Sequence, residues 1–224
     1  MMKTAISWSA GKDSCLALLR AEEAGHRVET LVTMCEADGL SKSHALPPAL
    51  IQAQVAALGR RWVPVCVPAG SGQYAACFAA QLAALRDEGH TQMVFGDIDL
   101  RAHRDWLEPA CARAGLQALF PLWGESRAAL AEEIIARGIR ARLVCVDTRW
   151  LDASFVGAEY DHTLLARLPA GVCPCGEEGE FHSFVWCAPG FAAPLALRPG
   201  TPRRMQSTPP LAPTELVLQT PELA

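Results

Sequence analysis

The sequence has no excess of basic residues and no long apolar run. Twenty Lys and Arg residues stand against 24 Asp and Glu, and the net charge of −4 argues against a protein that binds nucleic acid over a broad basic surface. The most apolar helical stretch, residues 74–85, is much shorter than the roughly 20 consecutive apolar residues of a membrane span. We therefore expect neither a membrane protein nor a general nucleic-acid binder.

Lysine is scarce as well: Lys3, Lys12 and Lys42 are the only lysines among 224 residues. The other basic residues are arginines, a bias that is typical of a GC-rich genome. The chain otherwise has an ordinary globular composition, with 50% hydrophobic and 20% charged residues, which excludes a disordered, collagen-like or coiled-coil protein. Its length fits one large domain, or one domain with a small appendage.

Nine cysteines are many for this length, and their number is odd. Most lie in apolar stretches such as residues 143–146, where free cysteine behaves as a small hydrophobic residue. Because the start of the chain shows no signal-peptide pattern, we expect a cytoplasmic protein rather than a secreted disulfide framework. Cys173, Cys175 and Cys187 crowd near His182, but Cys-x-Cys is shorter than the usual zinc-site spacing, so metal binding there stays open.

Buried strands and amphipathic helices alternate over residues 1–150. Apolar runs bounded by turns predict strands buried on both faces, as in a parallel sheet, at residues 3–8, 28–35, 62–67, 92–95, 118–120 and 142–147. Apolar residues three and four apart predict helices at residues 14–24, 48–58, 74–88, 106–114 and 128–137. The expected fold is a doubly wound α/β domain with a mainly parallel sheet, in which ligands bind beyond the carboxyl ends of the strands.

The pattern changes after residue 150. Residues 151–197 contain short β-like pieces such as residues 181–186, and we expect them to form a small C-terminal subdomain containing β-structure. Six of the sixteen prolines fall within residues 198–224, where no periodic pattern continues. We expect that segment to be a flexible Pro-rich tail without a core of its own.

The loop after the first predicted strand has the composition of a phosphate site. Small residues allow backbone N–H groups to approach an anion, and the following helix offers unpaired donors at its N-terminus. The loop consists of Ser9, Ala10, Gly11, Lys12, Asp13 and Ser14. It is not a Walker A loop, because Asp13 follows the lysine where that loop has Ser or Thr. The alternative is that Ser9 or Asp13 only caps the helix.

This loop resembles the Ser-Gly-Gly-x-Asp-Ser loop of the PP-loop ATP pyrophosphatases. The resemblance implies an adenine nucleotide alpha hydrolase-like, Rossmann-like fold, and an enzyme that cleaves ATP between the α and β phosphates while the loop binds pyrophosphate. Ala10 departs from the pattern, where the family has its first glycine. An alanine is tolerated there if its φ angle stays negative, although its methyl group would lie close to the pyrophosphate.

Later stretches resemble the diphthine–ammonia ligase branch of that superfamily. Residues 175–184 read Cys-Gly-Glu-Glu-Gly-Glu-Phe-His-Ser-Phe, close to that branch's Cys-Gly-Glu-Asn-Gly-Glu-Phe-His-Thr/Ser-Phe signature. The other matching positions are Ser43-His44, Gly96-Asp97-Ile98, Arg101, Trp106, Glu108 and Pro121-Leu122-Trp123. The resemblance extends from about residue 3 to residue 191. The motif at residues 175–184 discriminates best between branches of the superfamily, because other PP-loop enzymes end in different domains.

The resemblance, together with the chemistry of the side chains, suggests roles for these residues. Beyond the loop after the first strand, Gly96, Asp97 and Arg101 are expected to bind ATP, and Asp97 is suited to hold Mg²⁺ or a ribose hydroxyl. The expected catalytic residues are Lys12, Asp13, Glu177, Glu180 and His182. The alternative for the two glutamates is a solvated acidic loop. His44 and Trp123 are expected on the side of the acceptor substrate.

Three functions remain to be compared. The resemblance implies an ATP-dependent ligase that adenylates a carboxylate and transfers ammonia to it, giving amide, AMP and pyrophosphate. Its acceptor would be diphthine, the modified histidine of elongation factor 2, if the host makes diphthamide, and another carboxylate in a bacterium. A tRNA-modifying PP-loop enzyme is disfavoured by the negative charge. A non-catalytic ATP-binding protein is the third candidate function, and Ala10 is the only feature of the sequence that supports it.

Overall fold

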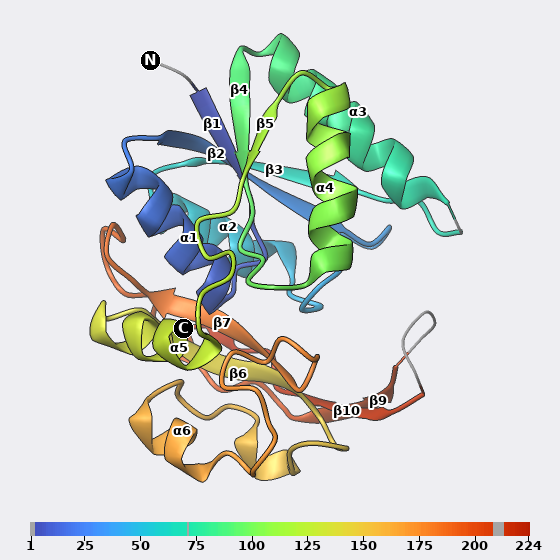
Figure 1. Ribbon diagram of the computed structural model, residues 1–224. Helices are drawn as coiled ribbons and strands as arrows, with labels where there is room; N and C mark the ends of the chain where they lie inside the picture. Colours follow the sequence, from blue (N-terminus) through green and yellow to red (C-terminus); the bar gives the residue numbers. More distant parts are fainter. Residues whose placement is uncertain (1–2, 71, 208–212) are drawn as a thin grey trace.

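The computed structural model describes residues 3–70, 72–207 and 213–224, which form two main sheets and a short two-stranded sheet with helices around them (Figure 1). The first sheet is parallel, in the order β3-β2-β1-β4-β5. Its elements are β1 (Lys3–Ser7), α1 (Lys12–Glu23), β2 (Arg27–Cys35), α2 (Pro48–Ala57), β3 (Arg61–Cys66), α3 (Gln73–Asp87), β4 (His90–Val94), α4 (Arg101–Arg113) and β5 (Gln117–Leu119). This order confirms the doubly wound α/β fold.

The strand order changes direction between β1 and β4, which lie side by side at the centre of the sheet. Ala5 and Ile6 of β1 and Val94 of β4 are fully buried, as the apolar runs predicted. In open α/β sheets, the crevice at such a switch point is where ligands bind. The loops that follow β1 and β4 are therefore placed to form a site.

The second sheet is antiparallel, in the order β7-β6-β10-β9, and a short two-stranded sheet pairs β8 with β11. The helices and strands of this second half of the chain are α5 (Arg127–Ala136), β6 (Arg140–Asp147), a 3₁₀ turn (Ala153–Phe155), α6 (His162–Arg167), β7 (Phe181–Cys187), β8 (Leu197–Arg198), β9 (Arg203–Gln206), β10 (Glu215–Leu218) and β11 (Glu222–Leu223). The prediction that residues 142–147 join the parallel sheet is therefore wrong. The apolar run correctly indicated a buried strand, but burial does not identify the partner strands.

The expectation of a flexible tail is also wrong wherever the chain is described. β10 lies between β6 and β9, with Val217 paired to Val146 and buried in the main hydrophobic cluster. The many prolines suggested a tail without strands. However, prolines such as Pro199, Pro202 and Pro221 lie between the short strands and do not interrupt them. Residues 208–212, which belong to the same predicted tail, lie outside the described residues.

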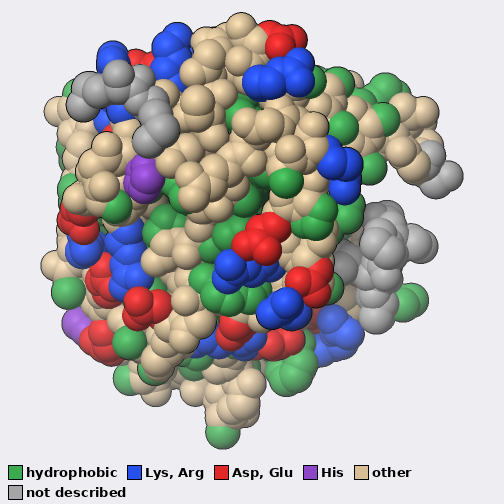
Figure 2. Space-filling view, turned by 45° about the horizontal axis from the view of Figure 1, so that its top comes forward, with side chains coloured by type: hydrophobic (Ala, Val, Ile, Leu, Met, Phe, Trp, Pro, Cys, Tyr) green, Lys and Arg blue, Asp and Glu red, His purple; other side chains and the backbone are tan. Residues whose placement is uncertain are grey.

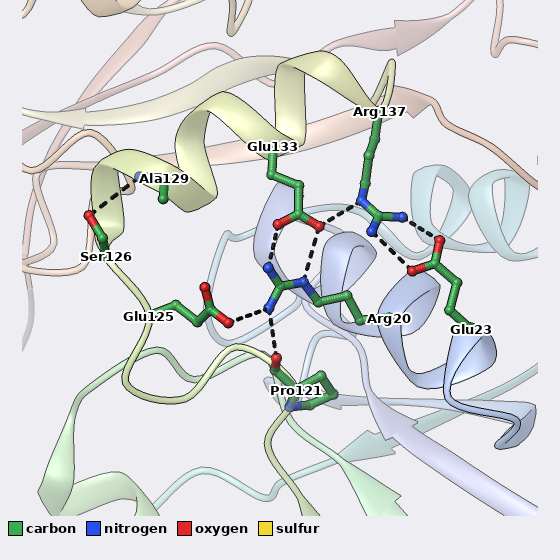
Figure 3. Close-up of polar contacts among 8 residues, drawn as sticks. All are labelled: Arg20, Glu23, Pro121, Glu125, Ser126, Ala129, Glu133 and Arg137. Atoms are coloured by element: carbon green, nitrogen blue, oxygen red, sulfur yellow. Dashed lines mark hydrogen bonds and ion pairs between the residues drawn. The ribbon is translucent and has the colours of Figure 1, made fainter.

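An ionic network joins α1, which follows β1 of the parallel sheet, to α5, which precedes β6 of the antiparallel sheet (Figure 3). Arg20 of α1 binds both carboxylate oxygens of Glu133 and donates to the carbonyl oxygen of Pro121 at 3.0 Å. Arg137 donates to Glu133 and also binds Glu23 of α1. Because two guanidinium groups share one half-buried carboxylate, the position of α1 relative to α5 is fixed by several directional contacts.

Charges of both signs are interspersed on the face drawn in Figure 2, where Lys and Arg side chains lie beside Asp and Glu side chains. Several of the exposed arginines form ion pairs, for example Arg61 with Glu88 and Arg198 with Glu222. Within the part of the chain that the structure describes, no helix has the length and hydropathy to cross a membrane.

Candidate active site

The loop after β1 leads directly into the N-terminus of α1. Gly11 is the N-cap residue, and no side chain caps the helix there. The Ser9 hydroxyl accepts a hydrogen bond from the Gly11 amide at 3.2 Å and lies 3.1 Å from the Ser14 hydroxyl. The loop thus folds around its own hydroxyl groups, and the start of the helix faces a cavity with its positive dipole end. This arrangement is suited to binding an anion.

The cavity has a volume of about 330 Å³ and is lined from four separate parts of the chain. These are the loop after β1, the loop after β2, the segment between β4 and α4, and the segment that precedes and begins β7. The predicted site residues that line it are Ser9, Lys12, Asp13, Ser14, His44, Gly96, Asp97, Glu177 and His182. Residues distant in sequence therefore meet at the carboxyl edge of the parallel sheet.

Two glycines make this convergence possible. A Cβ atom on Gly11 would lie 2.8 Å from Cε1 of His44, closer than carbon atoms approach one another. A Cβ atom on Gly96 would lie 3.0 Å from the backbone nitrogen of Ser14. Glycine at these positions lets the loop after β2 and the end of β4 pack directly against residues 9–14, which we call the phosphate loop.

Three predicted site residues outside the loop after β1 lie elsewhere. The Arg101 side chain is 78% exposed on α4 and pairs with Asp105. Trp123 packs beneath the guanidinium of Arg104, 4.7 Å from the ring centroid, and is not among the described residues that line the cavity. Both predictions relied on the resemblance and on side-chain chemistry, and neither determines where a side chain points. Glu180 is the third, and its carboxylate has a different task.

Glu180 is completely buried. One carboxylate oxygen accepts from the backbone amide of Cys173 at 2.7 Å, and the other accepts from the backbone amide of Glu178 at 2.9 Å. The Glu180 side chain therefore holds the turn between residues 173 and 180 in shape, and it is not among the described residues that line the cavity. This corrects its expected placement beside the reacting groups.

Ala10 adopts a left-handed conformation, with a φ angle of +67°, so the condition of a negative φ is not met. Its carbonyl oxygen accepts hydrogen bonds from the amide of Val185 in β7 and from the side chain of Gln54 in α2. Its methyl group is fully buried in the main hydrophobic cluster and is not among the described groups lining the cavity. The methyl group therefore does not crowd the phosphate site, and the cost of alanine is backbone strain.

Lys12 is buried, and its ammonium lies between three kinds of partner. It donates to Asp13 at 2.8 Å and to the carbonyl oxygen of Cys175, and it lies 5.4 Å and 5.3 Å from the ring centroids of Tyr160 and Phe181. Burial alone lowers the pKa of Lys12, but the charge and hydrogen bond of Asp13 outweigh it, and the pKa is raised above its usual value. Lys12 is therefore a fixed positive charge at the cavity wall.

Two buried polar atoms near Lys12 have no hydrogen-bond partner among the described residues: Oδ1 of Asp13 and Nδ1 of His44. Both residues line the cavity. Leaving such atoms unpaired costs free energy, so their presence at a cavity wall points to partners supplied by a ligand.

His44 stacks with His182, with ring centroids 4.7 Å apart. Burial, the adjacent His182 ring and the charge of Lys12 hold the pKa of His44 well below its usual value. Burial and Lys12 also lower the pKa of His182, to about 4. Both rings are thus neutral near pH 7 and able to accept a hydrogen bond.

Glu177 lines the same cavity, and its pKa is raised, whereas those of the two histidines are lowered. Burial, and then the negative charge of Asp13, raise the pKa of the Glu177 carboxyl to about 7, although Lys12 opposes the shift. A carboxyl group with a pKa near neutrality is suited to transfer protons, because both of its forms are populated.

Gln54 and Ser183 support the phosphate loop, and the sequence analysis missed both. The Gln54 side chain is fully buried; it donates to the carbonyl oxygens of Ala10 and Val185 and accepts from the Trp8 indole at 2.6 Å. The Ser183 hydroxyl accepts from the backbone amide of Lys12 at 3.2 Å. A glutamine within an apolar helix was the only available signal for Gln54, whereas Ser183 stands inside the motif at residues 175–184.

The described residues include no group of three or more His, Cys, Asp and Glu side chains placed to hold a metal ion. Cys173, Cys175 and Cys187 are free thiols, and they do not converge on a shared center with His182. Burial raises the pKa of the Cys175 thiol to about 12, so this cysteine is protonated at neutral pH.

Comparison with known proteins identifies the family. The diphthamide synthase N-terminal domain matches residues 2–118, and the diphthamide synthase C-terminal domain matches residues 126–201. The chain belongs to the diphthamide synthase family. Its two matched regions meet where the chain passes from the parallel sheet of the diphthamide synthase N-terminal domain to α5 and the antiparallel sheet.

Relatives of known name cover most of the chain. The diphthine–ammonia ligase of Danio rerio is 29% identical over 209 residues, covering 82% of this chain and 81% of that protein. The diphthine–ammonia ligase of Bos taurus is 26% identical over 215 residues, covering 85% and 80%. A solved structure of a predicted subunit of tRNA methyltransferase from Methanocaldococcus jannaschii superposes with a TM-score of 0.44 at 19% identity, covering 62% of this chain and 77% of that chain.

Proposed function

We propose that the protein is an ATP-dependent ligase that adenylates a carboxylate and transfers ammonia to it, with diphthine as the acceptor. One observation carries this proposal: the phosphate-binding loop after β1 and the loop of residues 175–183 line a single cavity. A nucleotide bound by the first loop would therefore expose its α-phosphate to groups of the second. Membership of the diphthamide synthase family supports the same reaction.

The reaction balances in two steps. A carboxylate oxygen of the acceptor attacks the α-phosphorus of ATP, the bond to the β-phosphate oxygen breaks, and pyrophosphate leaves. Ammonia then attacks the carbonyl carbon of the acyl adenylate, AMP leaves with the bonding electrons, and the nitrogen loses a proton. The amide, AMP and pyrophosphate are the products.

The phosphate loop binds and orients the leaving pyrophosphate. The backbone amides at the start of α1 donate to phosphate oxygens, and the charge of Lys12 stabilises the negative charge that develops on them. The hydroxyl groups of Ser9 and Ser14, which donate to Ser14 and to the Gly11 carbonyl oxygen, hold the loop in shape. Lys12 is held in place by Asp13 and the carbonyl oxygen of Cys175 before substrate arrives, so little reorganisation is needed.

Asp13 and Asp97 are the residues that would hold Mg²⁺. Oδ1 of Asp13 is buried without a hydrogen-bond partner, and Asp97 lines the same cavity with a side chain that is 17% exposed. Carboxylate oxygens together with phosphate oxygens are the ligands that Mg²⁺ prefers. When bound, the ion would neutralise phosphate charge during adenylation.

Glu177, His44 and His182 form the ammonia side of the cavity. The two histidines are neutral, so a lone pair on a ring nitrogen is available to accept from ammonia or ammonium. Glu177 takes up the proton that the nitrogen releases, for which a pKa of about 7 is suitable. Glu180 contributes by holding the loop that carries Glu177.

The test is to incubate the protein with ATP, Mg²⁺, ammonium and elongation factor 2 carrying diphthine. We expect AMP and pyrophosphate in equal amounts, together with a mass change of the acceptor from acid to amide. Omission of ammonium is expected to abolish the amide. Recovery of intact ATP under all these conditions would refute the proposal and favour a non-catalytic ATP-binding protein.

A further inference from the structure

A second cavity adjoins the phosphate-loop cavity, between α3 and α4. Its volume is about 730 Å³, more than twice that of the first cavity. Ser7, Asp97 and His103 line both cavities, so a molecule that reacts in the first can extend into the second. Neither ATP chemistry nor ammonia activation, as derived above, assigns a role to this space.

Aromatic rings form much of the wall of the second cavity. Tyr74 and Phe78 of α3 face Trp106 of α4, with ring centroids 5.8 Å and 5.1 Å from that of Trp106. Tyr74 is 40% exposed and Trp106 is 38% exposed, which is unusual for large rings in a cluster. The Trp106 ring is inclined by 42° to Tyr74 and by 32° to Phe78. The Tyr74 and Phe78 rings are themselves parallel to within 9°, so the inclined Trp106 ring closes the wall of a rounded space rather than the far side of a parallel slot for a flat base.

The charges in this wall favour a cation. Asp97 lies where the two cavities meet, and the described residues of the second cavity include no Lys or Arg. His103 is the other titratable group in the wall, and its Nδ1 atom lies 2.9 Å from the Asp97 carboxylate. Aromatic faces beside a carboxylate attract ammonium groups, and quaternary ammonium groups above all, because they need no hydrogen-bond acceptor.

We propose that this aromatic cavity binds the quaternary ammonium group of the acceptor while the adjoining carboxylate reaches the phosphate-loop cavity. This inference rests on the proposed function, because it assumes an acceptor in which a quaternary ammonium lies beside the reactive carboxylate, as in diphthine. Trp106 is then a residue that determines acceptor specificity, and Asp97 lies close to both groups of the acceptor.

The test uses tetramethylammonium as the probe and the uncharged neopentyl alcohol as its match in shape. Binding is measured by saturation-transfer NMR without nucleotide, so that it does not depend on catalysis. Trp106→Leu removes the aromatic face, Trp106→Phe keeps one, and Trp150→Leu is the matched control, since Trp150 is 42% exposed and is not among the described residues of either cavity. Thermal unfolding of each variant reports whether the fold survives.

We expect tetramethylammonium to bind at least fivefold more tightly than neopentyl alcohol. We expect Trp106→Leu to weaken its binding about tenfold, Trp106→Phe to weaken it less, and Trp150→Leu to leave it unchanged. In the ligase assay, Trp106→Leu should raise the KM for the acceptor and leave the KM for ATP unchanged.

Two results would overturn the inference. One is equal binding of the charged and uncharged probes; the other is displacement of tetramethylammonium by adenosine, which would assign the cavity to the base of ATP. Failure of the proposed function is a separate result: cation binding that depends on Trp106, without amide formation on diphthine, keeps the cation site and refutes the ligase. Conversely, amide formation with an unchanged KM in Trp106→Leu refutes the cation site alone.

Discussion

The ammonium of Lys12 donates a hydrogen bond to the carbonyl oxygen of Cys175, joining segments 163 residues apart in the chain. A second contact runs alongside, from the backbone amide of Lys12 to the Ser183 hydroxyl. The phosphate loop of the parallel sheet is thereby tied to the motif that precedes and begins β7. In the proposed reaction, this one lysine therefore connects the loop that binds pyrophosphate with the ammonia side of the cavity.

Replacing Lys12 by methionine keeps the aliphatic stem and removes the charge. We expect pyrophosphate release to fall by at least 100-fold, because the developing phosphate charge loses its fixed counter-charge. The Cys175 carbonyl and the Asp13 carboxylate lose a donor in a buried place, and stability should fall by about 1–3 kcal/mol. Steady-state pyrophosphate assays and urea unfolding measure the two effects.

The matched control is Lys3→Met, because Lys3 is exposed at the start of β1 and is not among the described residues of the cavity. It should leave turnover and the urea midpoint unchanged. Normal pyrophosphate release in Lys12→Met would show that the loop after β1 is not the phosphate site.

Replacing Glu180 by glutamine tests whether this buried carboxylate holds the loop rather than takes part in the reaction. Glutamine keeps one acceptor oxygen, but its amide nitrogen is a donor and would face one of the two backbone amides, those of Cys173 and Glu178. We expect a loss of about 1.5–3 kcal/mol in stability, the range for hydrogen bonds to charged groups. Thermal unfolding and hydrogen exchange of residues 173–180 measure the loss.

Glu178→Gln is the control for Glu180→Gln, because the Glu178 side chain is 54% exposed and pairs with Arg127 at the surface. Its effect on stability should stay below about 1 kcal/mol. If Glu180→Gln abolished amide formation while stability and exchange remained those of the native protein, Glu180 would have a direct chemical role after all.

The sequence predicted most of the parallel sheet because each strand is a short apolar run between turns. It failed for residues 142–147 and for Val217, since an apolar pattern shows that a strand is buried but not which strands flank it. The antiparallel sheet depends on pairings between distant segments, and no local pattern specifies them.

The passage from β1 through a loop into the start of α1 could be predicted because local sequence determines it, and the phosphate-binding role of that loop stays a prediction. The directions of Arg101 and Glu180 could not be predicted, because each depends on contacts formed by the folded chain. Gln54 was missed for the same reason: its side-chain hydrogen bonds join α2 to the phosphate loop and to β7.

The proposed role of Glu177 predicts a dependence on pH. With a pKa of about 7, the carboxylate form increases as the pH rises through 7, and that form takes up the proton. At a constant concentration of free ammonia, the rate of amide formation should therefore rise through a midpoint near pH 7. Glu177→Gln should lower the rate at pH 8 at least tenfold and remove this midpoint. A midpoint that persists in the variant would assign the titration to another group.

Glu177 should also affect stability, which we expect to fall as the pH rises, whereas the rate of amide formation rises. Its pKa is raised in the folded state, so the folded protein binds this proton more tightly than the unfolded chain does. Its contribution to stability is therefore fully present below about pH 4.5 and is lost as the pH rises through about 7. We expect Glu177→Gln to have a higher melting temperature than the native protein at pH 8. An equal or lower melting temperature at pH 8 would show that the carboxylate is not destabilised by its surroundings.

Replacing Ala10 by glycine relieves the left-handed backbone. The strain of a non-glycine residue there costs about 1–2 kcal/mol, and the buried methyl group contributes about 0.8 kcal/mol. We therefore expect stability to rise by up to about 1 kcal/mol, with pyrophosphate release preserved, because the methyl group packs in the core. Ala79→Gly, on the exposed side of α3, is the control of opposite sign and should cost about 1 kcal/mol. A loss of stability in Ala10→Gly as large as that in Ala79→Gly would show that Ala10 is not strained.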